Sequence, residues 1–498
     1  MCIRDSTTTV KESEKEVNIS PKNLYGLDES QQSAILSDSP VVAVVAGPGT
    51  GKTKTLISKI IYLIEKRGVK PSEITAVTFT NQAAEEIQKR LQQHFNRRTA
   101  NSVVIGTFHA ICLRLLQQKG ICRTLAGEQE TLAVLQEVID KFALNDSPKK
   151  LLHLISQRKN SVFSEEVSAL SEEVYLFYQQ LLEQYGIMDY DDLLLLTLDA
   201  CKDEKFHKSA LFKHFSYLLV DEFQDINEIQ YQLILSWYLK ELFVIGDPDQ
   251  SIYGFRGADA SCFERLSSDF TNIFFARLSH NYRSTPQILN CALSVIEKNS
   301  SIMVPRTLTP QRENGANVRL LTAKDDFSQA VFIAKEINRK VGGIDMLDLQ
   351  TLAGHDTTQV AGFSDIAVLY RTHRQAELLE ECLRKEGIPY MVTGRDMPWD
   401  DPVAQMALSF FQCLLFPQDS AALCICLKCA GCPEDLIKNG LELLKAGDSI
   451  SRIFQVVSQQ VPHHISLAKL SLLSERLAPH VEKKQAFLLL QDLSLIHI

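Results

Sequence analysis

Short apolar runs alternate with longer amphipathic stretches in the first part of the chain. The apolar runs 41–46 and 75–79 are each followed by a stretch of helical periodicity, at 52–66 and 82–95. A change from strand-length apolar runs to a 3.6-residue period, repeated in this order, is typical of βαβ units. The pattern therefore predicts an α/β fold with parallel strands.

A long helical stretch then interrupts this alternation. Residues 108–212 carry helical periodicity throughout, for example in the Leu- and Gln-rich segments 128–142 and 172–184. Strand-like apolar runs return at three places, 217–220, 242–245 and 272–276. Because fully apolar runs of this length fill the interior of a parallel sheet, we expect the first sheet to resume and close after an all-helical insertion.

A second alternation of strands and helices begins near Asn281. The pattern predicts helices at 285–299, 327–339 and 375–386. It predicts strands at 318–322 and 365–370. After about Gly394 the periodicity is mainly helical, which indicates a helical accessory region.

Composition limits the class of protein without indicating a partner. Of the 498 residues, 45% are hydrophobic and 23% are charged, which is typical of a globular chain and excludes a largely disordered one. The formal net charge of −9 gives no bulk attraction to nucleic acid. Any nucleic-acid binding must therefore come from a local groove.

Neither a membrane span nor a secretory signal is visible. The apolar runs, such as 41–46 and 193–196, are far shorter than the roughly 18 residues that a membrane span needs. The first residues, 1–16, are polar and charged, unlike a signal peptide. We therefore expect a cytoplasmic protein.

Most of the twelve cysteines are scattered, as expected of reduced core residues in a cytoplasmic protein. One cluster, formed by Cys424, Cys426, Cys429 and Cys432, has spacings that could hold zinc or an iron–sulfur cluster. The surrounding residues have helical periodicity and no second ligand pair follows at metal spacing. Buried thiols are therefore the favoured interpretation, with metal binding as the alternative.

A phosphate-binding loop stands between the first predicted strand and helix. The string AGPGTGKT occupies the positions Ala46, Gly47, Pro48, Gly49, Thr50, Gly51, Lys52 and Thr53. Small residues let backbone N–H groups face a phosphate, and the N-terminus of the following helix adds positive potential. We expect Lys52 to reach the β- and γ-phosphates of ATP and the Thr53 hydroxyl to ligate Mg²⁺.

Two carboxylates end the predicted strand 217–220. Asp221 and Glu222 follow it directly, at the strand end where parallel sheets place their ligand sites. We expect Asp221 to hold Mg²⁺ and Glu222 to act as the general base on the attacking water. Alone, such a pair is more often a solvated turn, and the phosphate loop is what makes the catalytic interpretation the stronger one.

At the string DEFQD, residues 221–225, the sequence resembles the superfamily 1 helicases of the UvrD, Rep and PcrA type, and the resemblance covers about residues 24–415. It implies a P-loop NTPase with RecA-like parallel-sheet domains. The string LDESQ at 27–31 is similar to the Q motif, whose glutamine reads the adenine edge, so Gln31 is expected to select ATP. The string MDYDDL at 188–193 also matches the family.

The resemblance also implies a path for single-stranded DNA. Residues 76–84 and 106–109 are similar to motifs Ia and Ib, and 246–257 to motif III. The expected DNA contacts are Phe79, Thr107, His109, Tyr253, Phe255 and Arg256. Gln250 of motif III is expected to sense the γ-phosphate. Two positions depart from the family: Gln82 replaces a usual lysine, and Phe255 replaces a usual tryptophan.

The string NYRSTP at 281–286 resembles motif IV. The resemblance implies that Tyr282 packs on the adenine and that Arg283 reaches the γ-phosphate from a second domain, so that hydrolysis depends on closure of the cleft. The last two family motifs have no counterpart between Gly394 and Ile498. We therefore expect this chain to bind nucleotide but to unwind a duplex poorly.

These motifs divide the chain into five expected parts. Residues 1–21 are expected to be disordered or foreign, and the terminal strings MCIRDS and LSLIHI both look like cloning sequence. The remaining parts are a first RecA-like domain (22–107 and 201–278), its helical insertion (108–200), the first part of a second RecA-like domain (279–394) and a truncated helical accessory domain (395–498).

The function that the resemblance implies is an ATP-dependent, 3′ to 5′ DNA helicase or translocase in DNA repair or replication, with single-stranded DNA and duplex junctions as partners. Two alternatives stay open: the motor portion of a helicase–nuclease, and a non-catalytic nucleic-acid-binding remnant. The intact Lys52, Asp221, Glu222, Gln250 and Arg283 argue against the remnant.

Overall fold

The protein divides into two compact units, residues 1–316 and 317–498. The computed structural model describes residues 26–121, 123–160, 170–203, 210–238, 240–252, 254, 261–297, 308–342, 362–393, 402–417, 419–461 and 465–482. The expected foreign segment 1–21 lies outside these residues.

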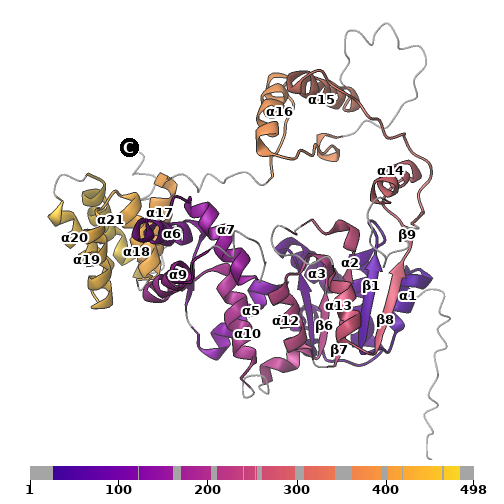
Figure 1. Cartoon of the computed structure of the whole chain (residues 1–498), viewed down its shortest axis with the longest axis horizontal. Helices are drawn as coiled ribbons and strands as arrows, with labels where there is room; N and C mark the ends of the chain where they lie inside the picture. Colours follow the sequence, from indigo (N-terminus) through magenta and orange to yellow (C-terminus); the bar gives the residue numbers. More distant parts are fainter. Residues whose placement is uncertain are drawn as a thin grey trace, which may run out of the picture. The chain divides into compact units, whose positions relative to one another are not determined.

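A six-stranded sheet forms the centre of the first unit (Figure 1). Its spatial order is β3 (Val104–Thr107), β2 (Ile74–Thr78), β6 (Tyr217–Val220), β7 (Glu241–Gly246), β1 (Val41–Ala46) and β8 (Ile273–Leu278). All neighbouring strands are parallel. The prediction that the sheet resumes after a helical insertion is confirmed, and every strand delivers its following loop to the same edge.

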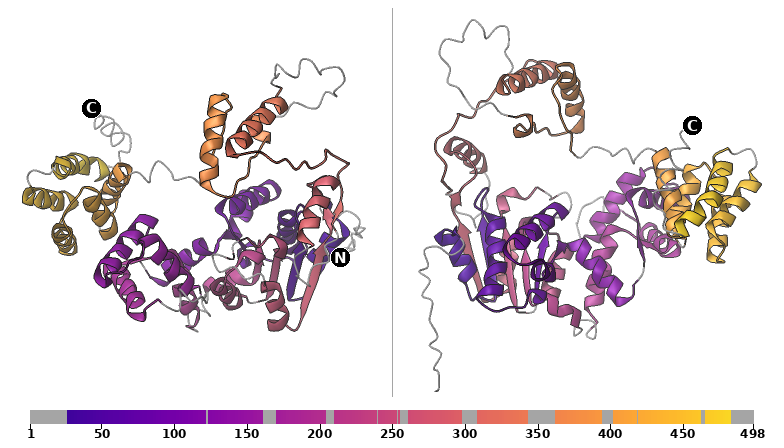
Figure 2. Two further views of the ribbon diagram at one scale, coloured as in Figure 1. Left: turned by 45° about the horizontal axis from the view of Figure 1, so that its top comes forward. Right: turned by 180° about the vertical axis from the view of Figure 1, so that it is seen from behind.

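Helices cover both faces of this sheet because both faces of its strands are apolar. Val42 and Val44 of β1 pack in one core with α1 (Glu29–Leu36), α2 (Lys52–Glu65), α3 (Asn81–His94) and α4 (Arg97–Ser102). Val41 and Ala43 point to the opposite core, with α12 (Glu228–Trp237), α13 (Cys262–Asp269) and two helices of the insertion. This three-layer arrangement can be followed from two further sides in Figure 2.

The insertion is helical, as predicted. Its helices are α5 (Phe108–Lys119), α6 (Glu128–Phe142), α7 (Pro148–Lys159), α9 (Glu172–Tyr185) and α10 (Tyr190–Cys201). Within the insertion, two short strands, β4 (Thr124–Leu125) and β5 (Ile187–Met188), pair in parallel. Helices α5 and α10 share the core of the sheet's second face, so the insertion grows from the sheet itself.

Short 3-10 helices of three to six residues form several of the connections. They are η2 (Pro71–Glu73), η3 (Ala210–Phe215), η4 (Phe223–Asp225) and η5 (Pro248–Gln250). Beyond β8, the chain forms β9 (His280–Asn281), which pairs in parallel with β10 (Thr309–Pro310), and α14 (Pro286–Ile296). These last elements still belong to the first unit.

The second unit contains no strand among its described residues. Helices α15 (Asp326–Lys340) and α16 (His373–Lys385) are present, as predicted, and they pack together. The predicted strands 318–322 and 365–370 are wrong. Phe363–Asp365 forms a 3-10 helix, η8, and the other residues of the two segments pair with no described strand. The apolar pattern is present, but no described strand lies beside it to pair with its backbone groups, and Leu320 and Leu369 are 96% and 94% exposed.

The predicted helical region after Gly394 is confirmed. It consists of α17 (Pro402–Leu415), α18 (Ser420–Cys429), α19 (Glu434–Lys445), α20 (Ile450–Gln460) and α21 (Ile465–Glu482). Cys424 and Cys426 are buried on α18, and burial raises the pKa of the Cys426 thiol. Throughout the described residues, no helix combines the length and apolar character that crossing a bilayer requires.

Candidate nucleotide site and nucleic-acid cavity

The carboxyl-terminal edge of the sheet gathers the predicted site residues. Across the strand order, β3 leads to Thr107 and His109, β2 leads to Phe79, and β6 leads to Asp221 and Glu222. Farther along the same edge, β7 leads to the loop with Gln250, β1 to the phosphate loop and β8 to Arg283. Apart from Gln31 on α1, the residues assigned to ATP therefore occupy four adjacent strand ends, and the described residues assigned to DNA occupy the other two.

The phosphate loop has the backbone that its glycines permit. Gly49 and Gly51 adopt φ angles of +69° and +83°, in the left-handed region that favours glycine. Thr50 closes the turn, because its Oγ1 donates to the Gly47 carbonyl over 2.7 Å. Gly51 is the N-cap of α2, so the first turn of that helix faces the loop with backbone N–H groups that have no partner within the helix.

Lys52 and Glu222 meet although they are far apart in the sequence. The Lys52 Nζ lies 2.7 Å from the Glu222 Oε2, and 12% of the lysine side chain is exposed. Glu222 itself adopts φ +48° and ψ +47°, which is uncommon for a residue with a side chain. Such a backbone costs about 1–3 kcal/mol and is concentrated at functional sites. The strained turn places the carboxylate of Glu222 against the phosphate-loop lysine.

The two carboxylates after β6 differ in their surroundings. Burial, and then the Glu222 carboxylate, raise the pKa of Asp221 to about 6. The backbone N–H of Glu222 donates to the Asp221 Oδ1 over 3.0 Å. Two adjacent carboxylates with Lys52 beside them leave excess negative charge, which a divalent cation would offset. Asp221 and the Thr53 hydroxyl offer the hard oxygen ligands that Mg²⁺ prefers.

Gln224 joins the loops that follow β6 and β7, a role that the sequence interpretation did not assign. Its side chain is buried; Nε2 donates to the Glu222 Oε2 over 2.9 Å, and Oε1 accepts from the backbone N–H of Asp247 over 2.8 Å. Asp247 in turn accepts from the Gln250 Nε2 over 2.7 Å. A glutamine two positions after the carboxylate pair was the available signal. The structure thus connects the expected base to the expected phosphate sensor.

Gln31 contacts the phosphate loop directly. Its Nε2 donates to the Thr50 carbonyl over 2.8 Å, and its Oε1 accepts from the Asp28 backbone N–H over 3.2 Å. Asp28 also accepts from the Tyr282 hydroxyl over 2.8 Å. Burial and this hydrogen bond to Asp28 raise the pKa of Tyr282 to about 12. Because a carboxamide has two N–H donors and an oxygen with two lone pairs, each end of Gln31 keeps one hydrogen-bonding position beyond these contacts.

Arg283 lies beside the phosphate loop. A β-carbon built on Gly49 would stand only 2.6 Å from the Arg283 Cβ, so the two backbones approach closely. The backbone N–H of Tyr282 donates to the Gly49 carbonyl over 2.9 Å. Asn281, to which the sequence gave no role, is fully buried and holds this segment in place. An asparagine directly before the Tyr-Arg pair, at a turn into a helix, was the signal that could have indicated it.

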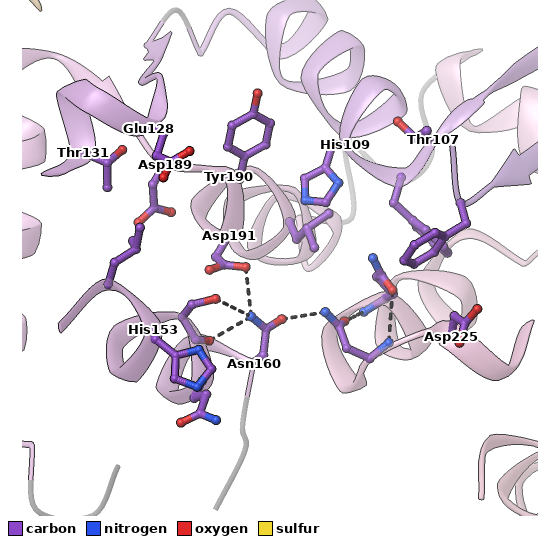
Figure 3. A pocket seen from close by; sticks show the side chains of 18 of the residues that line it. Thr107, His109, Glu128, Thr131, His153, Asn160, Asp189, Tyr190, Asp191 and Asp225 are labelled. Atoms are coloured by element: carbon purple, nitrogen blue, oxygen red, sulfur yellow. Dashed lines mark hydrogen bonds between the residues drawn. The ribbon is translucent and has the colours of Figure 1, made fainter. Parts of the chain in front are cut away.

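The predicted DNA contacts Phe79, Thr107 and His109 line a cavity of about 680 Å³ between the sheet edge and the insertion (Figure 3). The Thr107 Oγ1 caps α5 by accepting from the Ala110 N–H over 3.3 Å. The His109 ring meets the Tyr190 ring edge to face, with centroids 5.7 Å apart. Burial lowers the pKa of His109, and the negative charge of Asp191 offsets only part of this effect. The lowered pKa favours a neutral ring at pH 7.

The insertion supplies the opposite wall of this cavity. Asn160 follows α7, and its Nδ2 donates to Asp191 over 2.9 Å. Its Oδ1 accepts from the Nδ2 of Asn227, the N-cap of α12, over 2.6 Å (Figure 3). Carboxylates line the cavity too: Glu128, Asp189, Asp191 and Asp225. The remaining predicted DNA contacts, Tyr253, Phe255 and Arg256, lie outside the described residues.

Comparisons with known proteins identify two matching family models. Residues 27–271 match the UvrD/REP helicase N-terminal domain, and residues 276–439 match the UvrD-like helicase C-terminal domain. The chain is 31% identical over 423 residues to the ATP-dependent DNA helicase PcrA of Leuconostoc citreum, covering 80% of this chain and 54% of that protein.

Two further relatives have similar identities to this chain. The chain is 31% identical over 415 residues to the ATP-dependent DNA helicase Rep of Buchnera aphidicola subsp. Schizaphis graminum, covering 80% of this chain and 61% of that protein. It is 32% identical over 421 residues to PcrA of Bacillus subtilis, covering 80% of this chain and 55% of that protein. The chain thus spans between about half and three fifths of the length of these curated relatives.

Proposed function

The chain belongs to the UvrD/Rep helicase family, and on this premise we propose that it is the ATP-hydrolysing part of a cytoplasmic DNA translocase. The proposed activity is ATP-driven movement 3′ to 5′ along single-stranded DNA, with strand separation at duplex junctions in repair or replication. The observation that carries the proposal is the ion pair between Lys52 and Glu222, which joins the phosphate loop to the expected base at one sheet edge.

We assign ATP to the four strand ends that carry the phosphate loop, Asp221 with Glu222, Gln250, and Arg283. Backbone N–H groups of the loop and the N-terminus of α2 bind the phosphates, with Lys52 beside them. Thr53 and Asp221 would hold Mg²⁺, which offsets charge on the phosphate oxygens. Gln31 and Tyr282 lie on the side of the loop where the base of the nucleotide would be read.

Phosphate binding and activation of Glu222 are linked through Lys52. In the structure the Lys52 ammonium is committed to the Glu222 carboxylate at 2.7 Å. A bound γ-phosphate competes for that ammonium group, so its arrival releases Glu222 to accept a proton from water. Gln224 keeps the released carboxylate in place through its 2.9 Å hydrogen bond. The base is therefore available only when a nucleotide is present.

We place single-stranded DNA along the strand ends of β2 and β3, in the cavity of Phe79 and His109. Aromatic side chains stack on bases of any sequence, with about 1–3 kcal/mol per base. Because four carboxylates and one lysine, Lys149, line this cavity and burial favours neutral His109, the lining suits bases better than phosphates. The DNA backbone would therefore run along its rim.

Equilibrium binding of a fluorescent ATP analogue to residues 1–498, with Mg²⁺, tests the nucleotide assignment. Lys52→Ala should lose at least about tenfold in affinity, because hydrogen bonds to charged groups contribute about 1.5–3 kcal/mol. Lys66→Ala, at the exposed end of the same helix, is the matched control and should bind like the wild type. Equal affinities for all three proteins would overturn the assignment.

Hydrolysis and DNA dependence need a second measurement. Glu222→Gln should retain nucleotide affinity but lose about 100-fold or more in ATP hydrolysis, because a general base contributes about 10²–10⁴-fold. Single-stranded DNA should stimulate hydrolysis by the wild type when the chain is extended to the length of its relatives. Residues 1–498 alone should unwind a duplex poorly. Hydrolysis that does not respond to DNA in the extended chain would contradict a motor.

A further inference from the structure

Three successive carbonyl groups of the phosphate loop are held by donors from outside the loop. The Pro48 oxygen accepts from the Asn281 Nδ2 over 2.6 Å, and the Gly49 oxygen accepts from the Tyr282 backbone N–H over 2.9 Å. The Thr50 oxygen accepts from the Gln31 Nε2 over 2.8 Å. Two of the three donors belong to the short segment that begins after β8.

These contacts decide where the N–H groups of the loop point. In a trans peptide the C=O and N–H bonds are antiparallel. Holding the Pro48 oxygen therefore turns the Gly49 N–H to the opposite side, and holding the Thr50 oxygen does the same for the Gly51 N–H. A phosphate site of this kind works because successive N–H groups face the anion. The external donors thus select the loop conformation that can bind phosphate.

Asn281 has the most complete set of contacts in this segment. Its side chain is fully buried, and its Nδ2 is used on Pro48. Its Oδ1 accepts from the backbone N–H of Arg283 over 3.0 Å and from that of Ser284 over 2.8 Å. The Asn281 carboxamide therefore binds the phosphate loop through its NH2 group and the backbone of Arg283 through its oxygen.

The phosphate loop and the backbone of Arg283 pack closely against each other. A β-carbon on Gly49 would stand 2.6 Å from the Arg283 Cβ and 2.8 Å from the Asn281 Nδ2. Gly49 has φ +69°, so both its conformation and its missing side chain are needed for this approach. Displacing Arg283 would therefore displace the carboxamide that orders the loop.

We propose that Asn281 is a positioning residue for nucleotide binding, which sets the phosphate loop in its anion-binding conformation and fixes Arg283 beside it. The inference rests on the proposed function. It adds that loop order and arginine position are coupled through a single side chain. Movement of the segment that starts at β9 then changes phosphate affinity without any change in the loop sequence.

Asn281→Asp separates the two ends of the carboxamide. Aspartate keeps the oxygen that accepts from the backbone N–H groups of Arg283 and Ser284, and it forms such side chain-to-backbone turns as readily as asparagine. It replaces the amide donor with an oxygen that faces the Pro48 carbonyl. Asn281→Ala removes both ends without adding a buried charge. Asn290→Asp makes the same chemical change at an exposed position of α14 and serves as the matched control.

Binding of a fluorescent ATP analogue, and its displacement by inorganic pyrophosphate, measures the effect on residues 1–498. We expect Asn281→Asp and Asn281→Ala to lose at least about tenfold in affinity for both ligands, with Asn290→Asp unchanged. Thermal melting without nucleotide verifies that each variant is folded. Wild-type affinity in Asn281→Asp, with loss only in Asn281→Ala, would show a capping role alone and overturn the proposal, as would wild-type affinity in both.

Hydrogen exchange of residues 47–52 in the nucleotide-free protein gives an independent readout. Loss of the Pro48 contact should raise amide exchange there in Asn281→Asp, while exchange in the insertion helices α6 and α9 stays as in the wild type. Unchanged exchange at 47–52 would refute the positioning role. If the wild type binds no nucleotide, the proposed function fails, and the exchange data still decide whether Asn281 orders the loop.

Discussion

Replacing Lys159 with methionine should destabilise the helical insertion more than any surface change. Lys159 is the last residue of α7 and none of its side chain is exposed. Its Nζ lies 2.6 Å from the Asp189 Oδ2 and 2.6 Å from the Asp192 Oδ1. Burial lowers the pKa of Lys159, but the two carboxylates outweigh this effect and the pKa is raised. The charged form is therefore the native one.

The magnitude follows from what the substitution leaves behind. Asp189 and Asp192 have 7% and 11% of their side chains exposed, and within the described residues Lys159 is the cation paired with them. Removing one partner of a buried ion pair costs about 3–5 kcal/mol, because the remaining charge stays desolvated. Here two carboxylates remain, and the Tyr178 hydroxyl, 2.8 Å from Asp189, offsets only part of that cost.

Hydrogen exchange measured by mass spectrometry localises the effect. A loss of 3 kcal/mol raises the local opening constant on the order of 100-fold, which should appear in peptides from α7, α9 and α10. Lys150→Met is the matched control on the same helix. Its lysine is 53% exposed and pairs with Asp146, so it should change stability by less than about 0.5 kcal/mol.

The pH dependence provides a second signature. In Lys159→Met the buried carboxylates have folded-state pKa values above those of the unfolded chain, so the variant gains stability as the pH falls through those values. In the wild type burial raises the pKa of Asp189 but Lys159 lowers it further, so this group loses stability as the pH falls, whereas burial leaves the pKa of Asp192 raised. The difference in the free energy of unfolding between the wild type and Lys159→Met should therefore become smaller from pH 7 to pH 4. A deficit below about 1 kcal/mol at pH 7, or one independent of pH, would refute this reasoning.

Two other predictions concern the loop that follows β7. Burial raises the pKa of Asp247 from 3.8 to about 6, so the folded protein holds a proton that the unfolded chain releases, and stability falls as the pH rises across this range. Asp247→Asn should become more stable than the wild type by up to ~3 kcal/mol between pH 4 and pH 7, and a difference in melting temperature that does not change with pH would exclude this. In Gly246→Ala the new Cβ would stand 2.4 Å from the Gln224 Oε1 and 2.9 Å from the Phe223 backbone nitrogen, which should cost about 1–3 kcal/mol in denaturant unfolding. Gly254→Ala, with nothing within 4 Å, is its control, and equal stability of the two variants would contradict the prediction.

Local sequence determined the elements of the first unit and the chemistry at their ends. The strand β1 and the helix α6 have the bounds that their apolar patterns predicted, because each element depends on its own periodicity. The phosphate loop was recognisable for the same reason, since its glycines, lysine and threonine are consecutive. The family motifs could be ordered along the chain before any fold was known.

The pattern failed where an element depends on a neighbour. Residues 318–322 and 365–370 have strand-like sequences, yet a strand exists only when another strand takes up its backbone hydrogen bonds. No described residue does so here. Periodicity describes the faces of a segment but carries no information about its partner.

The tertiary structure alone decided which distant groups meet. Lys52 and Glu222 are 170 residues apart, and Asn281 and Pro48 are 233 residues apart. Both contacts follow from the strand order, which places β1 beside β8 and, with β7 between them, near β6. Because the order of parallel strands is set by packing and crossover connections, not by local pattern, the sequence could name Lys52 and Glu222 but not their ion pair. It gave no indication that Asn281 holds the phosphate loop.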